Sequence, residues 1–88
     1  MTQIHFLEGK KFNMTCPANG DGEVRVNYAK SYGYVRPIVT QVNDASHWQY
    51  ITLAVTNDSP NYCIVHGHNI LNQNVTFTVQ IILIGAET

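Results

Sequence analysis

The sequence predicts a mainly β protein, a small antiparallel β-sandwich with at most one short helix. Three observations support this prediction. Apolar and polar residues alternate over several short segments, turn-forming dipeptides separate these segments, and no segment keeps a helical period over ten residues. Because successive side chains of a strand point to opposite faces, each alternating segment has one face available for a core. The 88 residues are expected to form one domain, 1–88.

Each predicted strand is bounded by turn or loop residues. The strands, in chain order, are "KFNMTC" (11–16), "EVRVNYA" (23–29), "GYVRPIVTQV" (33–42), "YITLAVT" (50–56), "YCIVHG" (62–67) and "VTFTVQIILIG" (75–85). The first two flank the turn cluster "ANGDG" and are expected to form a hairpin. Proline cannot donate a ladder hydrogen bond, so Pro37 predicts an edge strand or a bulge. One helical turn is expected in "DASHWQYI" (44–51), capped by Asp44 or Ser46.

The last segment differs from the others because its alternation ends in the continuous apolar run "IILI". Such a run indicates burial on both faces of the strand. As the terminal strand, it is also expected to offer an edge for self-association. It is too short for a membrane helix, which needs about 20 apolar residues, so no membrane insertion is expected.

The charge content limits the classes of partner. Charged residues make up 12% of the chain, about half the average for soluble domains, and the formal net charge is −1. Lys10 and Lys11 form a pair and not a basic patch, so no nucleic-acid partner is expected. The surface must therefore be rich in uncharged hydrogen-bonding groups, which suit neutral polar ligands such as sugars or protein surfaces.

Two opposing signals in the sequence bear on the compartment. The start of the chain lacks the long apolar core of a secretory signal, which is compatible with a cytosolic protein. Three glycosylation sequons, beginning at Asn13, Asn57 and Asn74, favour a secreted protein. We favour an extracellular location on the second signal.

The stretch "NYCIVHGHNILN" (61–72) contains the residue types of a metal or thiol site. His66 and His68 share a strand face and could supply two zinc ligands, but nothing in the sequence names a third among His5, His47, Glu8 and Cys63. We therefore expect no metal and no cofactor.

Catalytic chemistry is not indicated. The apolar setting of Cys63 favours an inert thiol over a nucleophile. The six carboxylates are dispersed, so no paired acid and base is indicated and no enzyme is expected.

Cys16 and Cys63 are the only cysteines. A bridge between them would close a long loop and stabilise so small a domain by roughly 4 kcal/mol. The alternative is two buried free thiols. The residues by themselves favour the bridge.

The order of four segments resembles the galactose/rhamnose-binding lectin domain of the sea-urchin-egg-lectin type. "LEGKKFNMTCP" is similar to its opening Cys-Glu-Gly and Cys-Pro, and "AKSYGY" to its Ala-Asn-Tyr-Gly-Arg element. "NYCIVHGHNIL" resembles its late Cys-x-Val segment, and "TFTVQIILIG" its final strand. The family pairs these cysteines with others that are absent from this chain, so the resemblance argues against a Cys16–Cys63 bridge.

The resemblance implies a non-enzymatic carbohydrate-binding protein for a neutral hexose or deoxyhexose of the galactose or rhamnose type. The family's sugar contacts carry over to Glu8, Tyr32 and Asn69, which are expected to converge on one shallow site. The family's lysine has no counterpart, and His68 or Asn72 is expected to replace it. Glycans are thus the expected partners, and weak single sites favour a homo-oligomer.

The alternative is an immunoglobulin-like or other β-sandwich module that binds protein and no sugar. Two cysteines with Trp48 between them suit an immunoglobulin domain. However, Asn61 stands where that fold has its tyrosine, and Trp48 lies too close to the second cysteine.

Overall fold

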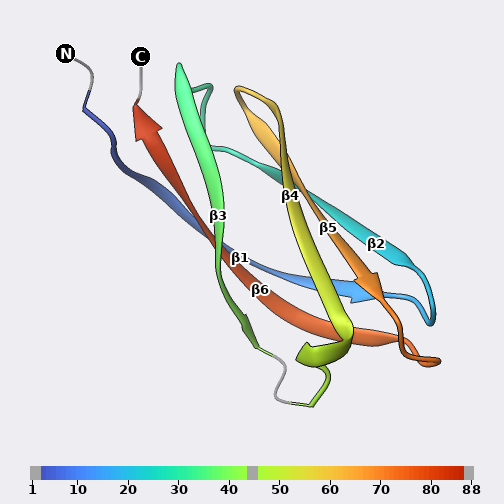
Figure 1. Cartoon of the computed structure of the whole chain (residues 1–88). Helices are drawn as coiled ribbons and strands as arrows, with labels where there is room; N and C mark the ends of the chain where they lie inside the picture. The colour runs from blue at the N-terminus through green and yellow to red at the C-terminus, as the bar shows by residue number, and fades with distance from the viewer. Residues whose placement is uncertain (1–2, 44–45, 87–88) are drawn as a thin grey trace.

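A computed structural model describes residues 3–43 and 46–86 (Figure 1). Over these residues the chain forms two antiparallel three-stranded sheets that pack as a β-sandwich, which confirms the predicted class. The strands are β1 (His5–Cys16), β2 (Asp21–Asn27), β3 (Tyr34–Asn43), β4 (Ile51–Ser59), β5 (Tyr62–Asn69) and β6 (Val75–Ala86). The molecule is elongated, 49 × 21 × 17 Å. No helix in the described part of the chain is long and apolar enough to cross a membrane.

The strand order is β1-β6-β3 in one sheet and β2-β5-β4 in the other. β4 and β5 form a hairpin, and β3 lies at an edge, as Pro37 predicted. The alternating segments all become strands, although β1 begins six residues earlier than its predicted start at Lys11. β6 lies between β1 and β3 and pairs with both along most of its length. The expectation that β6 forms a self-association edge is therefore wrong.

The predicted hairpin between the first two strands is also wrong, because β1 and β2 lie in different sheets. The turn between them carries the chain from one sheet to the other and is tied to the segment after β5. Asn19 adopts a left-handed φ of 52° and donates its backbone N–H to Leu71 O at 2.7 Å. Asn69 N donates to Gly20 O at 2.9 Å. The Asn-Gly dipeptide therefore makes a turn, but the turn joins two sheets.

The helical turn is a 3-10 turn, Trp48–Tyr50. Its N-cap is His47, with no side-chain cap hydrogen bond, so the predicted cap at Ser46 is wrong. Asp44, the other predicted cap, lies outside the described residues.

The core lies between the sheets and follows the alternation of the strands. Its fully buried side chains include Met14, Val65, Val79, Ile81 and Leu83. Cys16 and Cys63 are also fully buried, and no disulfide joins them, so the residue-based preference for a bridge is wrong. Cys16 packs against Gly67, four residues along β5 from Cys63. Four residues of a strand span about 13 Å, so Cys63 lies too far from Cys16 to form a disulfide with it.

Burial also keeps the Cys16 thiol unreactive. It raises the pKa of this thiol; a hydrogen bond from Gly22 N–H opposes the shift, and the charge of Asp21 adds to it.

Candidate functional site

Glu8 and Tyr32 lie together at one end of the sandwich, where other groups of the protein already take up their hydrogen-bonding atoms. Glu8 faces inward on β1, and its side chain is 12% exposed. Its carboxylate accepts hydrogen bonds from the Tyr32 hydroxyl and, at 2.9 Å, from the backbone N–H of Ala29, and pairs with Lys10 Nζ at 3.0 Å. Tyr32 is only 5% exposed. These contacts anchor the loop between β2 and β3 to β1.

The neighbouring contacts extend this anchor across the sandwich. The rings of Tyr28 and Tyr32 lie 6.0 Å apart, and the Tyr28 hydroxyl donates to Asn57 Oδ1 at 3.3 Å. Asn57 Nδ2 in turn donates to Val35 O at 3.0 Å. A polar and aromatic cluster thus joins the two sheets at this end. This cluster stabilises the fold and is not arranged for a ligand, because its hydrogen-bonding groups bond to one another.

The protonation of Glu8 is coupled to this anchor. Burial alone would raise the pKa of the Glu8 carboxyl, but hydrogen bonds from Tyr32, Lys10 and Ala29, with the charge of Lys10, outweigh it and lower the pKa. A lowered folded-state pKa contributes stability at neutral pH. That contribution is lost as the pH falls below the ordinary glutamate value and through the folded one.

We therefore expect Glu8→Gln to reduce the acid sensitivity of the fold. Wild-type protein should lose more free energy of unfolding between pH 6 and pH 3 than the variant, because a glutamine amide has no carboxylate to protonate. Urea denaturation at several pH values measures this difference, with Glu23→Gln, on an exposed carboxylate, as the control. Parallel stability curves for wild type and Glu8→Gln would contradict the assignment.

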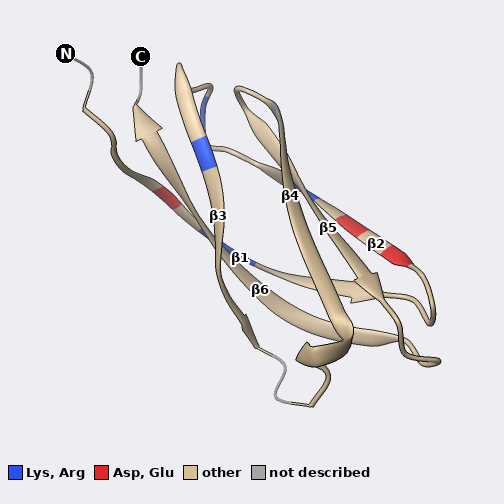
Figure 2. Ribbon diagram, in the orientation of Figure 1, with Lys and Arg blue, Asp and Glu red and all other residues tan. Residues whose placement is uncertain are grey.

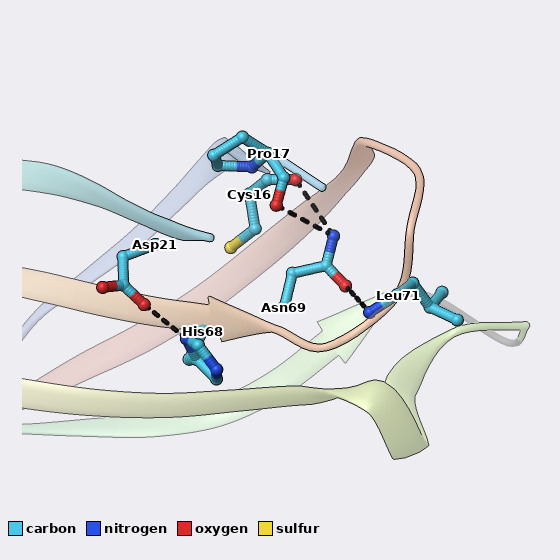
Figure 3. A network of polar contacts seen from close by, with 6 residues as sticks. All are labelled: Cys16, Pro17, Asp21, His68, Asn69 and Leu71. Carbon is cyan, nitrogen blue, oxygen red and sulfur yellow. Dashed lines mark hydrogen bonds and ion pairs between the residues drawn. The ribbon is translucent and has the colours of Figure 1, made fainter. Parts of the chain in front are cut away.

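Asn69 lies at the opposite end and is completely buried (Figure 3). Its Nδ2 group is within hydrogen-bond distance of three carbonyl oxygens, those of Cys16 at 3.3 Å, Pro17 at 3.2 Å and Gln73 at 2.8 Å. Its Oδ1 accepts from the backbone N–H of Leu71 at 2.9 Å. The side chain thus ties the end of β1 to the loop between β5 and β6, and no part of it is exposed to a ligand.

The expected convergence of Glu8, Tyr32 and Asn69 on one site is wrong. Glu8 pairs with Leu83 along β6, whereas Cys16, which Asn69 contacts, pairs with Val75. Eight residues of β1 separate the two ends, which is about 26 Å at 3.3 Å per residue. Asn72 is exposed in the loop after β5, and His68 projects from the outer face of the sheet. The five predicted ligand residues therefore lie in three places.

The structure places a different set of polar side chains together, on the outer face of the β2-β5-β4 sheet. Cys63 and Val65 of β5 point into the core, so His66 and His68 point outward. In the register of the sheet, Asp21 and Thr52 flank His68, and Glu23 and Ala54 flank His66. A hollow of about 620 Å³ lies over this part of the sheet, lined by these six residues and by Gly22, Leu53 and Gly67. We call it the histidine groove.

Both imidazoles in the histidine groove are held by cross-strand partners. His68 Nδ1 lies 2.5 Å from Asp21 Oδ1 (Figure 3), and His66 Nδ1 lies 3.4 Å from Glu23 Oε2. His66 Nε2 is also 2.8 Å from Thr56 Oγ1. All four ionisable side chains are well exposed, from 40% for His66 to 79% for Asp21. The pairs therefore present oriented hydrogen-bonding groups to solvent.

The charge around the histidine groove is acidic. Its acidic residues are Asp21 and Glu23, and Figure 2 shows acidic positions close together on β2. No lysine or arginine is among the described residues that line it. Within residues 3–43 and 46–86, no group of three or more His, Cys, Asp or Glu side chains could hold a metal ion.

Only part of the groove could be anticipated. The period of two correctly places His66 and His68 on one face. The sequence puts Asp21 in the turn cluster "ANGDG" and Glu23 at the start of a predicted strand, and it links neither carboxylate to a histidine. Their own alternation was a usable signal, since Asp21, Glu23 and Arg25 share one phase. Which histidine each carboxylate meets depends on the pairing of β2 with β5, and this pairing is not encoded in either segment alone.

A second, smaller hollow of about 270 Å³ lies beside Tyr32, and Tyr34, Arg36 and Asn57 also line it. The Arg36 guanidinium lies 4.3 Å from the centre of the Tyr34 ring, and the Asn57 amide is bonded to Val35. Its aromatic face and its amide therefore already have partners, which makes this hollow the weaker candidate.

The fold and the groove define a small β-sandwich with a polar hollow on one sheet face. Comparison of the chain with protein-family models, with curated proteins and with solved structures finds no match.

Proposed function

We propose that this protein is a lectin-like module that binds a neutral carbohydrate in the histidine groove. The observation that supports this most directly is the set of oriented carboxylate, imidazole and hydroxyl groups on one open sheet face. The ligand class is the one that the lectin resemblance implies, but the site lies elsewhere on the fold. Of the five ligand residues expected from the sequence, His68 is the one that lines the histidine groove.

The chemistry of the groove suits a sugar ring. Carboxylates such as Asp21 accept hydrogen bonds from vicinal hydroxyls, and an imidazole or the Thr52 hydroxyl can donate or accept. Ala54 and the backbone of Gly67 provide a small apolar surface between these polar groups. An open hollow of this kind suits the exposed ring of a glycan end better than a fully enclosed small molecule.

The charges of the groove favour a neutral ligand over an anionic one. Asp21 and Glu23 would repel a phosphate, a sulfate or a sialic acid, and no cation among the described lining residues would offset them. A hexose or deoxyhexose of the galactose or rhamnose type carries no such charge.

Asp21→Asn and His68→Ala are expected to weaken sugar binding at least tenfold each. A hydrogen bond to a charged group contributes about 1.5–3 kcal/mol, and about 1.4 kcal/mol corresponds to a factor of ten. A glycan array of neutral and acidic glycans selects the ligand, and calorimetric titration with that sugar measures the dissociation constants. Both residues are more than half exposed, so the variants should stay folded, which circular dichroism checks.

Asn72→Ala is the matched control, since Asn72 is exposed but does not line the groove. Its dissociation constant should stay within twofold of the wild-type value. An array without any bound glycan, or a loss of binding in Asn72→Ala with none in the groove variants, would refute the proposal.

A further inference from the structure

The outer face of the β1-β6-β3 sheet has an apolar half that the described chain leaves uncovered. Val79, Ile81 and Leu83 of β6 point into the core, so Ile82 and Ile84 point outward. The register places Phe6 and Arg36 beside Ile84, and Ile38 beside Ile82. Tyr34, two residues before Arg36, lies on the same face. We call Phe6, Tyr34, Ile38, Ile82 and Ile84 the apolar outer patch.

The other half of this face differs, because its side chains satisfy one another. Thr78 donates to Asn13 Oδ1 at 2.9 Å, and the hydroxyls of Thr15 and Thr76 lie 2.9 Å apart. The division matches the sequence of β6, where alternation changes to the run "IILI" that indicates burial on both faces. The core covers the inner face of β6, whereas none of the residues that the structure describes covers the apolar half of the outer face.

The size of the patch suits a protein interface. Phe6 is 60% exposed, Ile38 42% and Tyr34 39%. The full surface of a large side chain is roughly 200 Å². With the exposed parts of the half-buried Ile82 and Ile84 added, the patch exposes about 400 Å². A standard interface buries about 800 Å² per partner, a little over half of it apolar. The patch thus supplies nearly all the apolar area that such an interface needs.

The distribution of charge identifies the occupant. Among the described residues of this face the charges are both positive, Lys11 and Arg36, and the aromatic Phe6 lies on the opposite edge from Arg36. Rotation by 180° about β6 exchanges the two edges, so that β1 of one copy lies on β3 of the other. Phe6 of one copy then lies against Arg36 of the other, which already stacks on Tyr34 of its own chain. Contact between the Arg36 guanidinium and the Phe6 ring is favourable.

We propose that a second copy of this chain covers the apolar outer patch in a face-to-face dimer whose two-fold axis runs along β6. Ile82 and Ile84 lie near the axis and meet their own counterparts, as a two-fold interface requires. An axis across the strands would place β3 on β3 and Arg36 against Arg36, which like charges disfavour. The dimer leaves both histidine grooves open, because they lie on the other sheet.

Sedimentation equilibrium of the wild-type chain over a range of concentrations should show a reversible monomer–dimer transition. Phe6→Lys and Ile38→Lys should each raise the dissociation constant of the dimer at least tenfold, since both place a further cation in the patch. Asn27→Lys, an exposed position on the outer face of β2, is the charge-matched control and should leave it unchanged. A wild-type chain that stays monomeric at millimolar concentration would overturn the proposal.

Cysteine cross-linking tests the axis independently of affinity. Ile84→Cys should form an interchain disulfide with itself under mild oxidation, whereas Phe6→Cys alone should not, because the axis places Phe6 on the partner's β3. The native thiols are fully buried and do not compete. Rapid self-cross-linking of Phe6→Cys with none in Ile84→Cys would overturn the proposed arrangement.

Discussion

Replacement of Asn69 with alanine is expected to lower the free energy of unfolding by about 3 kcal/mol, one of the two largest single-residue effects that we predict. The substitution removes the donors to Cys16, Pro17 and Gln73 and the acceptor of Leu71 N–H at a fully buried position. A buried polar group that loses its partner costs about 1–3 kcal/mol. For a domain of this size, the melting temperature should fall by roughly 12–24 °C.

Thermal and urea denaturation of Asn69→Ala measure this loss. Asn72→Ala is again the control, because Asn72 is exposed in the same loop and should change stability by no more than about 0.5 kcal/mol. Equal stability of Asn69→Ala and Asn72→Ala would show that the amide does not hold this corner. A structural role for Asn69 would then have to be abandoned.

Gly22→Ala is expected to destabilise the fold by a comparable amount, about 3 kcal/mol or more. A Cβ atom at Gly22 would lie 2.3 Å from Thr15 O, which is backbone and cannot rotate away. The strand would have to shift at the point where the chain crosses between the sheets. Overpacking of this kind usually costs about 1–3 kcal/mol, and a backbone obstruction lies at the upper end of that range.

Gly9→Ala provides the matched comparison for Gly22→Ala in the same kind of experiment. A Cβ atom there would meet only Phe6 Cζ, at the ordinary contact distance of 3.7 Å. We expect its urea midpoint to stay close to that of wild type. If Gly22→Ala proved as stable as Gly9→Ala, the close approach of β2 to the end of β1 would be refuted.

The sequence predicted the strands well because their alternation is a local property. The phase of Phe12, Met14 and Cys16 gave the buried face of β1, and Pro37 indicated the edge position of β3. Local patterns specify a face but no partner. The assignment of β1 and β2 to different sheets, and the central position of β6, depend on pairings between distant segments that alternation does not contain.

The structural roles of Glu8 and Asn69 are predictable if the alternation of inward positions is continued along β1 and β5. Glu8 continues the inward series of β1, and Asn69 continues the series Cys63, Val65 and Gly67 of β5. A polar side chain in an inward position must be hydrogen-bonded inside the protein, which makes it a structural residue before it is a ligand contact. The family resemblance rests on residue types and contains no information about this phase.

The histidine groove can be recognised only from the pairing of the strands in three dimensions. His66 and His68 are recognisable in the sequence, but Asp21 lies 47 residues away from its partner His68. A carboxylate in "ANGDG" has the appearance of an ordinary turn residue. Only the antiparallel pairing of β2 with β5 aligns two acidic side chains with two imidazoles on one face.

The central claim is that a neutral sugar binds on the outer face of the β2-β5-β4 sheet, and amide NMR titration tests it most directly. Addition of the array-selected sugar to the isotopically labelled chain should shift the backbone signals of Asp21, Thr52 and His68. The signals of Glu8 and Tyr32, at the far end of β1 and about 26 Å from the Asn69 corner, should stay in place. Shifts confined to the Glu8 and Tyr32 end, with none in the groove, would contradict the account.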